Sequence, residues 1–285
     1  VAVTDNDTPN LVVSTEAVTV AEAGSAIYMV RLAKQPTDAV TVTVLGMGNG
    51  VSVDTDGGMQ GQQASLSFTT GNWNAEQTVT VSAADDDNTI FETVTLTHTA
   101  DGGGYDAVSQ ALVVVNVTDD DTGSLVVSPE AVTVAEKGSA TYTVKLATEP
   151  TDGVMVTVQG MGNGVSVDTD RRRGGQQTSL GFTTSNWDRW QTVTVWAAAD
   201  DNIVFETVTL AHSAVGGGYD AVNQALVVVT VTDDDTAGLV VSAETVNVVE
   251  EDSATYTVKL ATPPTGAVTV TVGGMGSGVS VDTDS

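Results

Sequence analysis

The stretch Val40-Thr41-Val42-Thr43-Val44 alternates valine with threonine over its whole length. Successive side chains of a β-strand point to opposite faces, so this alternation places the valines on one face and the threonines on the other. Both residue types are branched at Cβ, which favours a strand over a helix. The stretch therefore predicts a half-buried strand whose valine face is turned towards a core.

The same period of two recurs on either side of this stretch, and no segment has a helical pattern. Clusters of Gly, Asn and Asp separate the alternating segments and predict turns. Seven or eight short strands in about 110 residues predict an all-β fold, an immunoglobulin-like β-sandwich. The predicted strands cover residues 17–20, 28–32, 40–44, 65–68, 78–81, 93–96 and 112–117.

The whole pattern is repeated along the chain. Leu-Val-Val-Ser at 11–14 returns at 125–128 and at 239–242, a shift of 114 residues each time. Residues 11–121 align with 125–235 without a gap and share 82 identities in 111 positions. Such internal similarity is typical of tandem modules.

The repeat predicts the domain organisation. Residues 1–8 match the tail of a preceding module, 9–122 form a first module, 123–236 a second, and 237–285 the N-terminal half of a third. Half a module cannot bury a core of its own, so we expect this last segment to fold poorly alone. Either the natural chain continues beyond it or another molecule completes it. The short link at 122–124 predicts a semi-rigid string of modules.

The composition argues against several classes of binding partner. The 285-residue chain has 9 Lys and Arg against 37 Asp and Glu, a formal net charge of -28, and no cysteine. This charge argues against nucleic acid and against adsorption to an anionic membrane surface, because both require clustered cations. No apolar run reaches the roughly 18 residues that a membrane helix needs, so we expect no membrane insertion in this segment. Metal cations and water are the natural partners of such a surface.

Acidic side chains gather at equivalent positions of each repeat. A Glu follows the opening strand, an Asp pair with a Glu beyond it follows a central strand, and an Asp triplet closes the last strand; an Asp-Thr-Asp segment adds a fourth position. The candidate metal ligands are Glu22, Asp54, Asp56, Asp86, Asp87, Glu92, Asp119, Asp120 and Asp121 in the first module, and Glu136, Asp168, Asp170, Asp200, Asp201, Glu206, Asp233, Asp234 and Asp235 in the second.

These clusters favour calcium. Alternate strand ends of a sandwich lie at one pole, so loops far apart in sequence can meet there. Calcium takes six to eight hard oxygen ligands, many of them carboxylates, and uncompensated carboxylates that lie close together repel one another. The alternative is that the Asp runs are solvated turn formers, which duplication would copy as faithfully as ligands.

At these residues the sequence resembles the Calx-beta family, the regulatory domains of sodium–calcium exchangers, which also occur in integrin β4 and in bacterial surface proteins. The resemblance rests on the Glu after the first strand, the central Asp pair followed by Glu, and the terminal Asp triplet. It implies a seven-stranded sandwich with calcium (Ca2+) at the pole nearest the next domain, and the same acidic residues as ligands, with Asp54 or Asp56 in the remaining loop position.

No set of nucleophile, base and orienting residue stands out, so we do not expect an enzyme. The preferred interpretation is a structural or adhesive repeat segment of an extracellular, cell-surface protein, a spacer or fibre stiffened by calcium. Its expected partners are neighbouring modules of the same chain, and other copies in a fibre. Two alternatives stay open: an adhesin module that binds glycans or a receptor, and a calcium-sensing regulatory domain.

Overall fold

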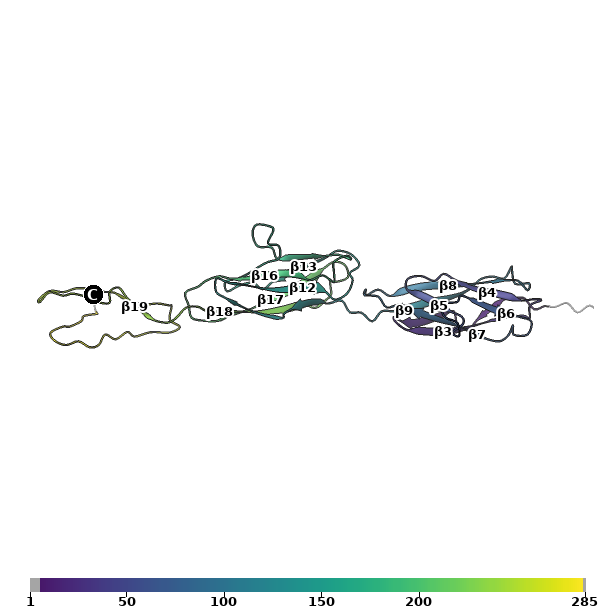
Figure 1. Ribbon diagram of the computed structural model, residues 1–285, viewed down its shortest axis with the longest axis horizontal. Coiled ribbons are helices and arrows are strands. Elements are labelled where there is room, and N and C mark those ends of the chain that lie inside the picture. Colours follow the sequence, from purple (N-terminus) through teal and green to yellow (C-terminus); the bar gives the residue numbers. More distant parts are fainter. Residues whose placement is uncertain (1–5, 284–285) are drawn as a thin grey trace, which may run out of the picture.

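The structure, a computed structural model that describes residues 6–283, contains β-strands and no helix in that range (Figure 1). Accordingly, the described chain offers no helix that could cross a membrane. The predicted all-β class is confirmed. Strand β4 (Val40–Leu45) has the predicted polarity, because Val40, Val42 and Val44 are buried whereas Thr41 is exposed.

Residues 11–118 form one sandwich of two sheets. The first sheet has the strand order β1-β3-β7-β5 and the second β2-β9-β8-β4-β6. The strands are β1 (Leu11–Val13), β2 (Ala17–Ala21), β3 (Ser25–Leu32), β4 (Val40–Leu45), β5 (Val51–Asp54), β6 (Ser65–Phe68), β7 (Gln77–Ala83), β8 (Glu92–Asp101) and β9 (Ala111–Thr118). We call this sandwich module 1.

Module 2 repeats this arrangement over residues 125–232, with sheets β10-β12-β16-β14 and β11-β18-β17-β13-β15. Its strands are β10 (Leu125–Ser128), β11 (Ala131–Ala135), β12 (Ser139–Leu146), β13 (Val154–Gln159), β14 (Val165–Asp168), β15 (Ser179–Phe182), β16 (Gln191–Ala197), β17 (Glu206–Val215) and β18 (Ala225–Thr232). Figure 1 shows the two modules end to end.

The strand order identifies the immunoglobulin-like type of sandwich. The first strand of module 1 is divided between the sheets: β1 pairs antiparallel with β3, and β2 pairs parallel with the last strand, β9. All other pairings are antiparallel. The parallel pairing of β2 and β9 matters for the site below, because it brings the carboxyl ends of both strands to the same end of the sandwich.

Between the sheets, valines from alternate strand positions fill each core. A tyrosine–histidine pair crosses each core. The Tyr28 hydroxyl lies 2.6 Å from His98 Nε2, and His98 Nδ1 lies 3.0 Å from the carbonyl of Ala111. Tyr142 and His212 repeat the pair in module 2 at 2.7 Å. These buried histidines are hydrogen-bonded inside the protein, so they are not free to bind a metal.

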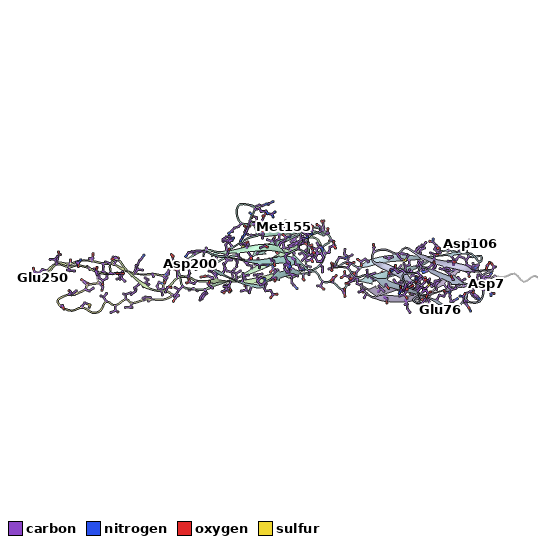
Figure 2. The ribbon with its side chains drawn as sticks, viewed as in Figure 1. Asp7, Glu76, Asp106, Met155, Asp200 and Glu250 are labelled. Atoms are coloured by element: carbon purple, nitrogen blue, oxygen red, sulfur yellow. The ribbon has the colours of Figure 1, made fainter. Side chains whose placement is uncertain are left out.

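The turn between β8 and β9 lies at the end of module 1 away from module 2, where Figure 2 labels Asp106. Gly102, Gly103 and Gly104 all have positive φ, a conformation that side chains rarely adopt. The Tyr105 hydroxyl donates to the Lys34 carbonyl (2.6 Å) and accepts from the Lys34 amide (3.1 Å), which fixes this turn to the β3–β4 connection.

The two modules contact each other through the backbone. The amide of Glu149, in the β12–β13 turn of module 2, donates to the carbonyl of Asp87, in the β7–β8 loop of module 1, at 2.7 Å. The neighbouring residue Asn88 forms an isolated parallel bridge with Glu149. The β7–β8 loop of module 1 is therefore part of the joint with module 2.

The third repeat is described as far as Asp282 and Thr283 and contains one two-stranded sheet, β19 (Leu239–Val241) with β20 (Val258–Leu260). Its register, Leu239 opposite Leu260, is that of Leu11 opposite Leu32 in module 1. Apolar residues that would face a core in a complete module, such as Val268 and Val270, are exposed here.

Candidate metal centre

Three chain segments meet at the end of module 1 that faces module 2, which we call the acidic pole. Glu22 follows β2 and starts the turn into β3; residues 85–87 follow β7, and β8 begins at Glu92; Asp119 to Asp121 follow β9. The parallel pairing of β2 with β9 and the register of Ser25 with Ser82 bring these strand ends together. Segments about a hundred residues apart thus supply one cluster.

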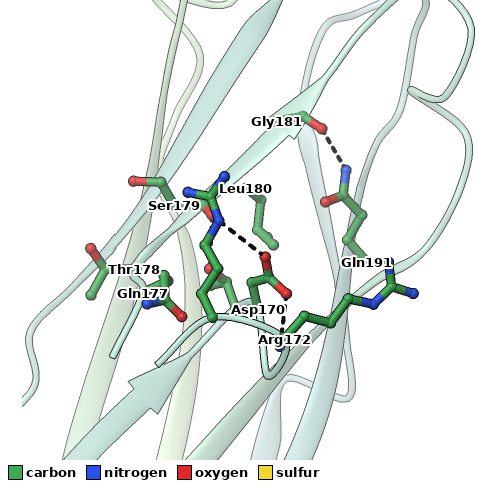
Figure 3. Close-up of a pocket in the computed structure, with 10 residues that line it drawn as sticks. Asp170, Arg172, Gln177, Thr178, Ser179, Leu180, Gly181 and Gln191 are labelled. Atoms are coloured by element: carbon green, nitrogen blue, oxygen red, sulfur yellow. Dashed lines mark hydrogen bonds and ion pairs between the residues drawn. The ribbon is translucent and has the colours of Figure 1, made fainter. Parts of the chain in front are cut away.

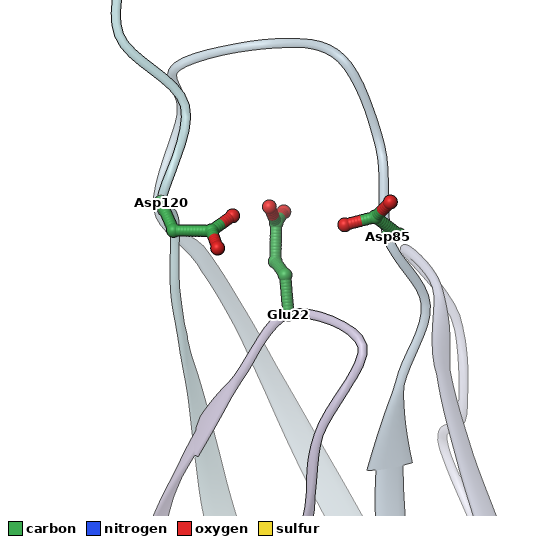
Figure 4. Close-up of side chains that lie close together, drawn as sticks. All are labelled: Glu22, Asp85 and Asp120. Atoms are coloured by element: carbon green, nitrogen blue, oxygen red, sulfur yellow. The ribbon is translucent and has the colours of Figure 1, made fainter.

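Glu22 lies at the centre of this cluster. It is 6% exposed, and neither of its carboxylate oxygens has a hydrogen-bond partner. Figure 4 shows its side chain standing between Asp85 and Asp120, with the three carboxylates directed at one another. One oxygen from each of these residues lies within 4.8 Å of the others, and Glu22 forms a second such group with Asp86 and Glu92.

These spacings fit a divalent ion. Two oxygens bound to the same calcium at 2.3–2.6 Å can be at most about 5 Å apart. Two ionised carboxylates at such a distance repel by roughly 3–4 kcal/mol at the effective dielectric of a protein surface. Four acidic side chains lie close to one buried glutamate, so protons or a cation among them would stabilise the cluster.

The aspartates divide their oxygens between two tasks. Asp86 Oδ1 accepts a hydrogen bond from the amide of Asn88, and Asp119 Oδ1 accepts one from the amide of Asp121, each at 2.9 Å. Asp119 Oδ2 is buried without a partner. In each aspartate one carboxylate oxygen stabilises the local turn, and the other oxygen remains available to bind a cation.

Burial and the nearby negative charges raise the pKa of several carboxyl groups in the cluster. Burial, reinforced by the charges of Asp86, Asp119, Glu92 and Asp120, raises the pKa of Glu22 from 4.5 to about 7. Burial and Asp86 also raise the pKa of Glu92, and burial together with Asp119 and Asp120 raises that of Asp121. A bound cation would reverse these shifts, because it favours the ionised form of every carboxylate around it.

Module 2 carries the same arrangement at its own acidic pole, where Figure 2 labels Asp200 beside the third repeat. Glu136 is 5% exposed, and its Oε1 has no partner, while Oε2 lies 3.4 Å from the amide of Asp200. The close groups are Glu136, Asp200 and Glu206; Glu136, Asp234 and Asp235; and Asp200, Asp233 and Asp235. Asp233 Oδ2 and Asp235 Oδ2 are buried without partners.

Two differences make the second cluster less negative. Ala199 replaces Asp85, and Lys137 replaces Ala23. The Lys137 ammonium lies 3.4 Å from the carboxylate of Asp234. Burial still raises the pKa of Glu136 and of Asp235, although Lys137 counteracts the effect on Asp235.

Most of the predicted ligands lie at the acidic poles. Asp87 and Asp201 lie at the edge, close enough that their charges raise the pKa of Asp121 and of Asp235 respectively. One residue was missed by sequence reasoning: Asp85 lies in a close group with Glu22. Only the pair Asp86 and Asp87 recurs in module 2, where Ala199 occupies the position of Asp85. The signal that points to it is its place in the unbroken run Asp85 to Asp87.

The expectation for Asp54, Asp56, Asp168 and Asp170 needs correction, because the structure does not bring them to the acidic poles. Strand β5 runs antiparallel to β7, with Val51 opposite Ala83 and Asp54 opposite Thr80. It therefore begins at the acidic pole and runs away from it. Asp54 Oδ1 accepts a hydrogen bond from the amide of Asp56 at 2.9 Å, so this pair stabilises a turn after β5 and not a metal site at the pole.

The solved structures that this chain matches have low sequence identities and low TM-scores. No protein-family model and no curated protein matches the chain. Among solved structures, the chain is similar to the fibronectin(III)-like modules of CbhA from Clostridium thermocellum, with 9% identity, a TM-score of 0.25, and coverage of 78% of this chain and 94% of that one.

Two further structures are similar to the same degree. One is a chimeric titin Z1Z2-Z1Z2 tandem, with 15% identity and a TM-score of 0.22, covering 80% of this chain and 100% of that one. The other is the N-terminal four Ig domains of Dscam1 isoform 1.9, with 12% identity and a TM-score of 0.26, covering 76% of this chain and 43% of that one. The immunoglobulin-like fold of this chain is defined by its own strand order.

Proposed function

We propose that this chain is a segment of an extracellular structural or adhesive repeat array whose modules each bind calcium at the acidic pole. One observation carries the proposal: Glu22 is buried with both carboxylate oxygens unpartnered, amid carboxylates from two other loops. Burying such a group without a counter-charge is costly, and a divalent ion surrounded by oxygens removes that cost. Glu136 supports the same assignment in module 2.

The ligands in module 1 would be Glu22, Asp85, Asp86, Glu92 and the Asp119 to Asp121 segment. The donor set consists of hard oxygens without histidine or cysteine, which suits calcium better than zinc. The resemblance to the Calx-beta family agrees with this donor set.

Calcium at this position would act on the joint between modules. The β7–β8 loop supplies Asp85 and Asp86 to the cluster, and the same loop accepts the Glu149 amide through Asp87. An ion that orders the loop therefore also orders the contact with module 2. In this proposal the array is a spacer that is stiff with calcium and more flexible without it.

The test is a calcium titration of the whole chain by isothermal calorimetry, with Glu22→Gln as the probe and Asp54→Asn as its control. Glutamine keeps the size of the side chain and removes its charge, so we expect calcium affinity at module 1 to fall at least about tenfold, which corresponds to about 1.4 kcal/mol. Asp54→Asn should bind as the parent does, since Asp54 lies outside the close groups.

Absence of calcium uptake at millimolar concentration would overturn the proposal. Stiffening is tested separately by small-angle X-ray scattering before and after chelation. We expect a smaller maximum dimension and a broader distribution of distances in chelator. Unchanged scattering would leave calcium binding in place but refute its mechanical role.

A further inference from the structure

The outward face of the first sheet differs sharply between the two modules. In module 2 it carries two exposed tryptophans, Trp190 at 47% and Trp196 at 43% exposure. The equivalent residues of module 1 are Glu76 and Ser82. Exposed indoles are costly to leave in water, so a pair of them on one sheet face marks an interaction surface.

Each tryptophan has a cation beside it. The Lys145 ammonium lies 5.4 Å from the centre of the Trp190 ring, and the Arg171 guanidinium lies 5.8 Å from that of Trp196. Arg171 Nε also donates to Thr194 Oγ1 at 3.0 Å, which fixes the guanidinium to strand β16. Neither cation has a carboxylate within 4.0 Å in the described part of the chain. Both are therefore free to pair with an anion.

Threonine side chains lie on the sheet between the two tryptophan–cation pairs. Thr141 lies opposite Thr194, and Thr143 opposite Thr192, on strands β12 and β16. In module 1 the positions of Thr141 and Thr143 hold Ile27 and Met29. The two tryptophans are six positions apart, or about 20 Å along an extended strand. We call this surface, with Lys145, Trp190, the threonines, Trp196 and Arg171, the indole–cation face.

The loop that supplies Arg171 adds further polar groups. Two clefts, of about 480 Å³ and 350 Å³, lie on either side of it. Figure 3 shows the larger one, where the Arg172 amide and the Arg173 side chain bond to Asp170, and Gln191 donates to the Gly181 carbonyl. Arg171, Arg172 and Thr192 line the smaller cleft, beside the sheet face, together with Asp168 and Asp170. A ligand on the face would meet this loop at one end.

We propose that the indole–cation face binds an acidic polysaccharide. Sugar rings stack on exposed indoles, and Arg171 and Lys145 suit the carboxylates of uronic acid units. The exposed hydroxyls of Thr141 and Thr192 offer hydrogen bonds along the strands, whereas Thr194 is buried. Charge complementarity favours an anionic polymer over a neutral one, because the face gathers free cations in a chain whose net charge is -28. The length of the face suits several linked units. This inference is independent of the calcium proposal.

The test uses the whole chain and polygalacturonate as the probe, in chelator so that calcium bridging at the acidic poles cannot contribute. Binding is measured by retention in affinity gel electrophoresis and by tryptophan fluorescence. The triple variant Trp190→Glu, Trp196→Ser, Arg171→Gly places module 1's own residues in module 2. Since module 1 has the same fold with these residues, we expect the variant to fold and to bind at least tenfold more weakly.

The reciprocal variant Glu76→Trp, Ser82→Trp, Gly57→Arg should give module 1 a second binding face and raise retention. A melting temperature close to that of the parent shows that each variant is folded. Equal binding of fully methyl-esterified polygalacturonate, which is neutral, would overturn the choice of an acidic ligand. Equal competition by polyglutamate, absence of binding, or full binding by the triple variant would overturn the proposal as a whole.

Discussion

Glu136 has a less negative environment than Glu22, because Ala199 stands in place of Asp85 and Lys137 pairs with Asp234. Calcium affinity rises with the number of charged ligands. We therefore expect module 2 to bind calcium more weakly than module 1. The double change Lys137→Ala, Ala199→Asp should raise its affinity about tenfold or more, measured by calorimetry in a Glu22→Gln background that weakens binding at module 1. An unchanged affinity would show that neither position acts on the ion.

The buried histidines predict a pH dependence of stability. Burial lowers the pKa of His98 and of His212 below the ordinary value of 6.5, so the folded protein keeps them neutral. As the pH falls below 6.5, the unfolded chain binds protons that the folded chain does not, and stability is lost. We expect the melting temperature in calcium to fall between pH 7 and pH 5.

Replacing both histidines by glutamine should flatten that part of the profile, because glutamine can still pair with the hydroxyls of Tyr28 and Tyr142 without titrating. A slope that survives the double substitution would have to come from other groups, and the assignment to the histidines would be wrong.

At the scale of single elements, the β8–β9 turn is tightly constrained. A Cβ on Gly103 would lie 2.6 Å from the carbonyl oxygen of Asp38 and 2.6 Å from Val40 Cγ2, at a φ of +56°. Gly103→Ala should therefore destabilise module 1 by about 2 kcal/mol or more. Urea unfolding followed by circular dichroism measures this change.

Gly57 supplies the matched control, since a Cβ there would meet nothing within 4 Å and its φ is not positive. Gly57→Ala should change stability by no more than about 0.5 kcal/mol. Similar losses in both variants would mean that helix and strand propensity, and not the close approach at Gly103, determines the effect.

The strands were predictable because valine and threonine alternate, and that pattern depends only on local geometry. Val40 to Val44 predicted both the strand and its buried face, which β4 confirms. The position of Asp54 was not predictable in the same way. Its place depends on the direction in which β5 runs beside β7, and no residue of the segment specifies that direction.

The convergence of Glu22 with the segments after β7 and β9 was expected from the general rule that strand ends meet at poles. Which loops share a pole depends on tertiary pairing, above all on the parallel alignment of β2 with β9. Trp196 lies on β16 and Trp190 one residue before it, so the two-residue period of a strand places both on one face. Which face is exposed depends on how the two sheets pack, and that is not defined by this segment alone.

At the scale of the whole molecule, the joint between modules includes a hydrogen bond donated by one backbone amide, that of Glu149. Glu149→Pro removes the hydrogen that bonds to the Asp87 carbonyl, so we expect a wider range of angles between the two sandwiches. Small-angle scattering, or distances between spin labels placed on each module, would report the change. Gln35→Pro is the equivalent change in module 1 and should leave the joint unaffected. Equal distributions in parent and Glu149→Pro would mean that other contacts hold the joint.

The third repeat already has a proline at this position. Pro263 is the counterpart of Glu149, and it has no amide hydrogen to offer to Asp201. The hydrogen bond at the first joint uses backbone atoms only, so every residue type except proline can donate it at this position. We therefore expect one residue per repeat to determine whether neighbouring modules share this backbone hydrogen bond, and so how widely they can bend relative to each other.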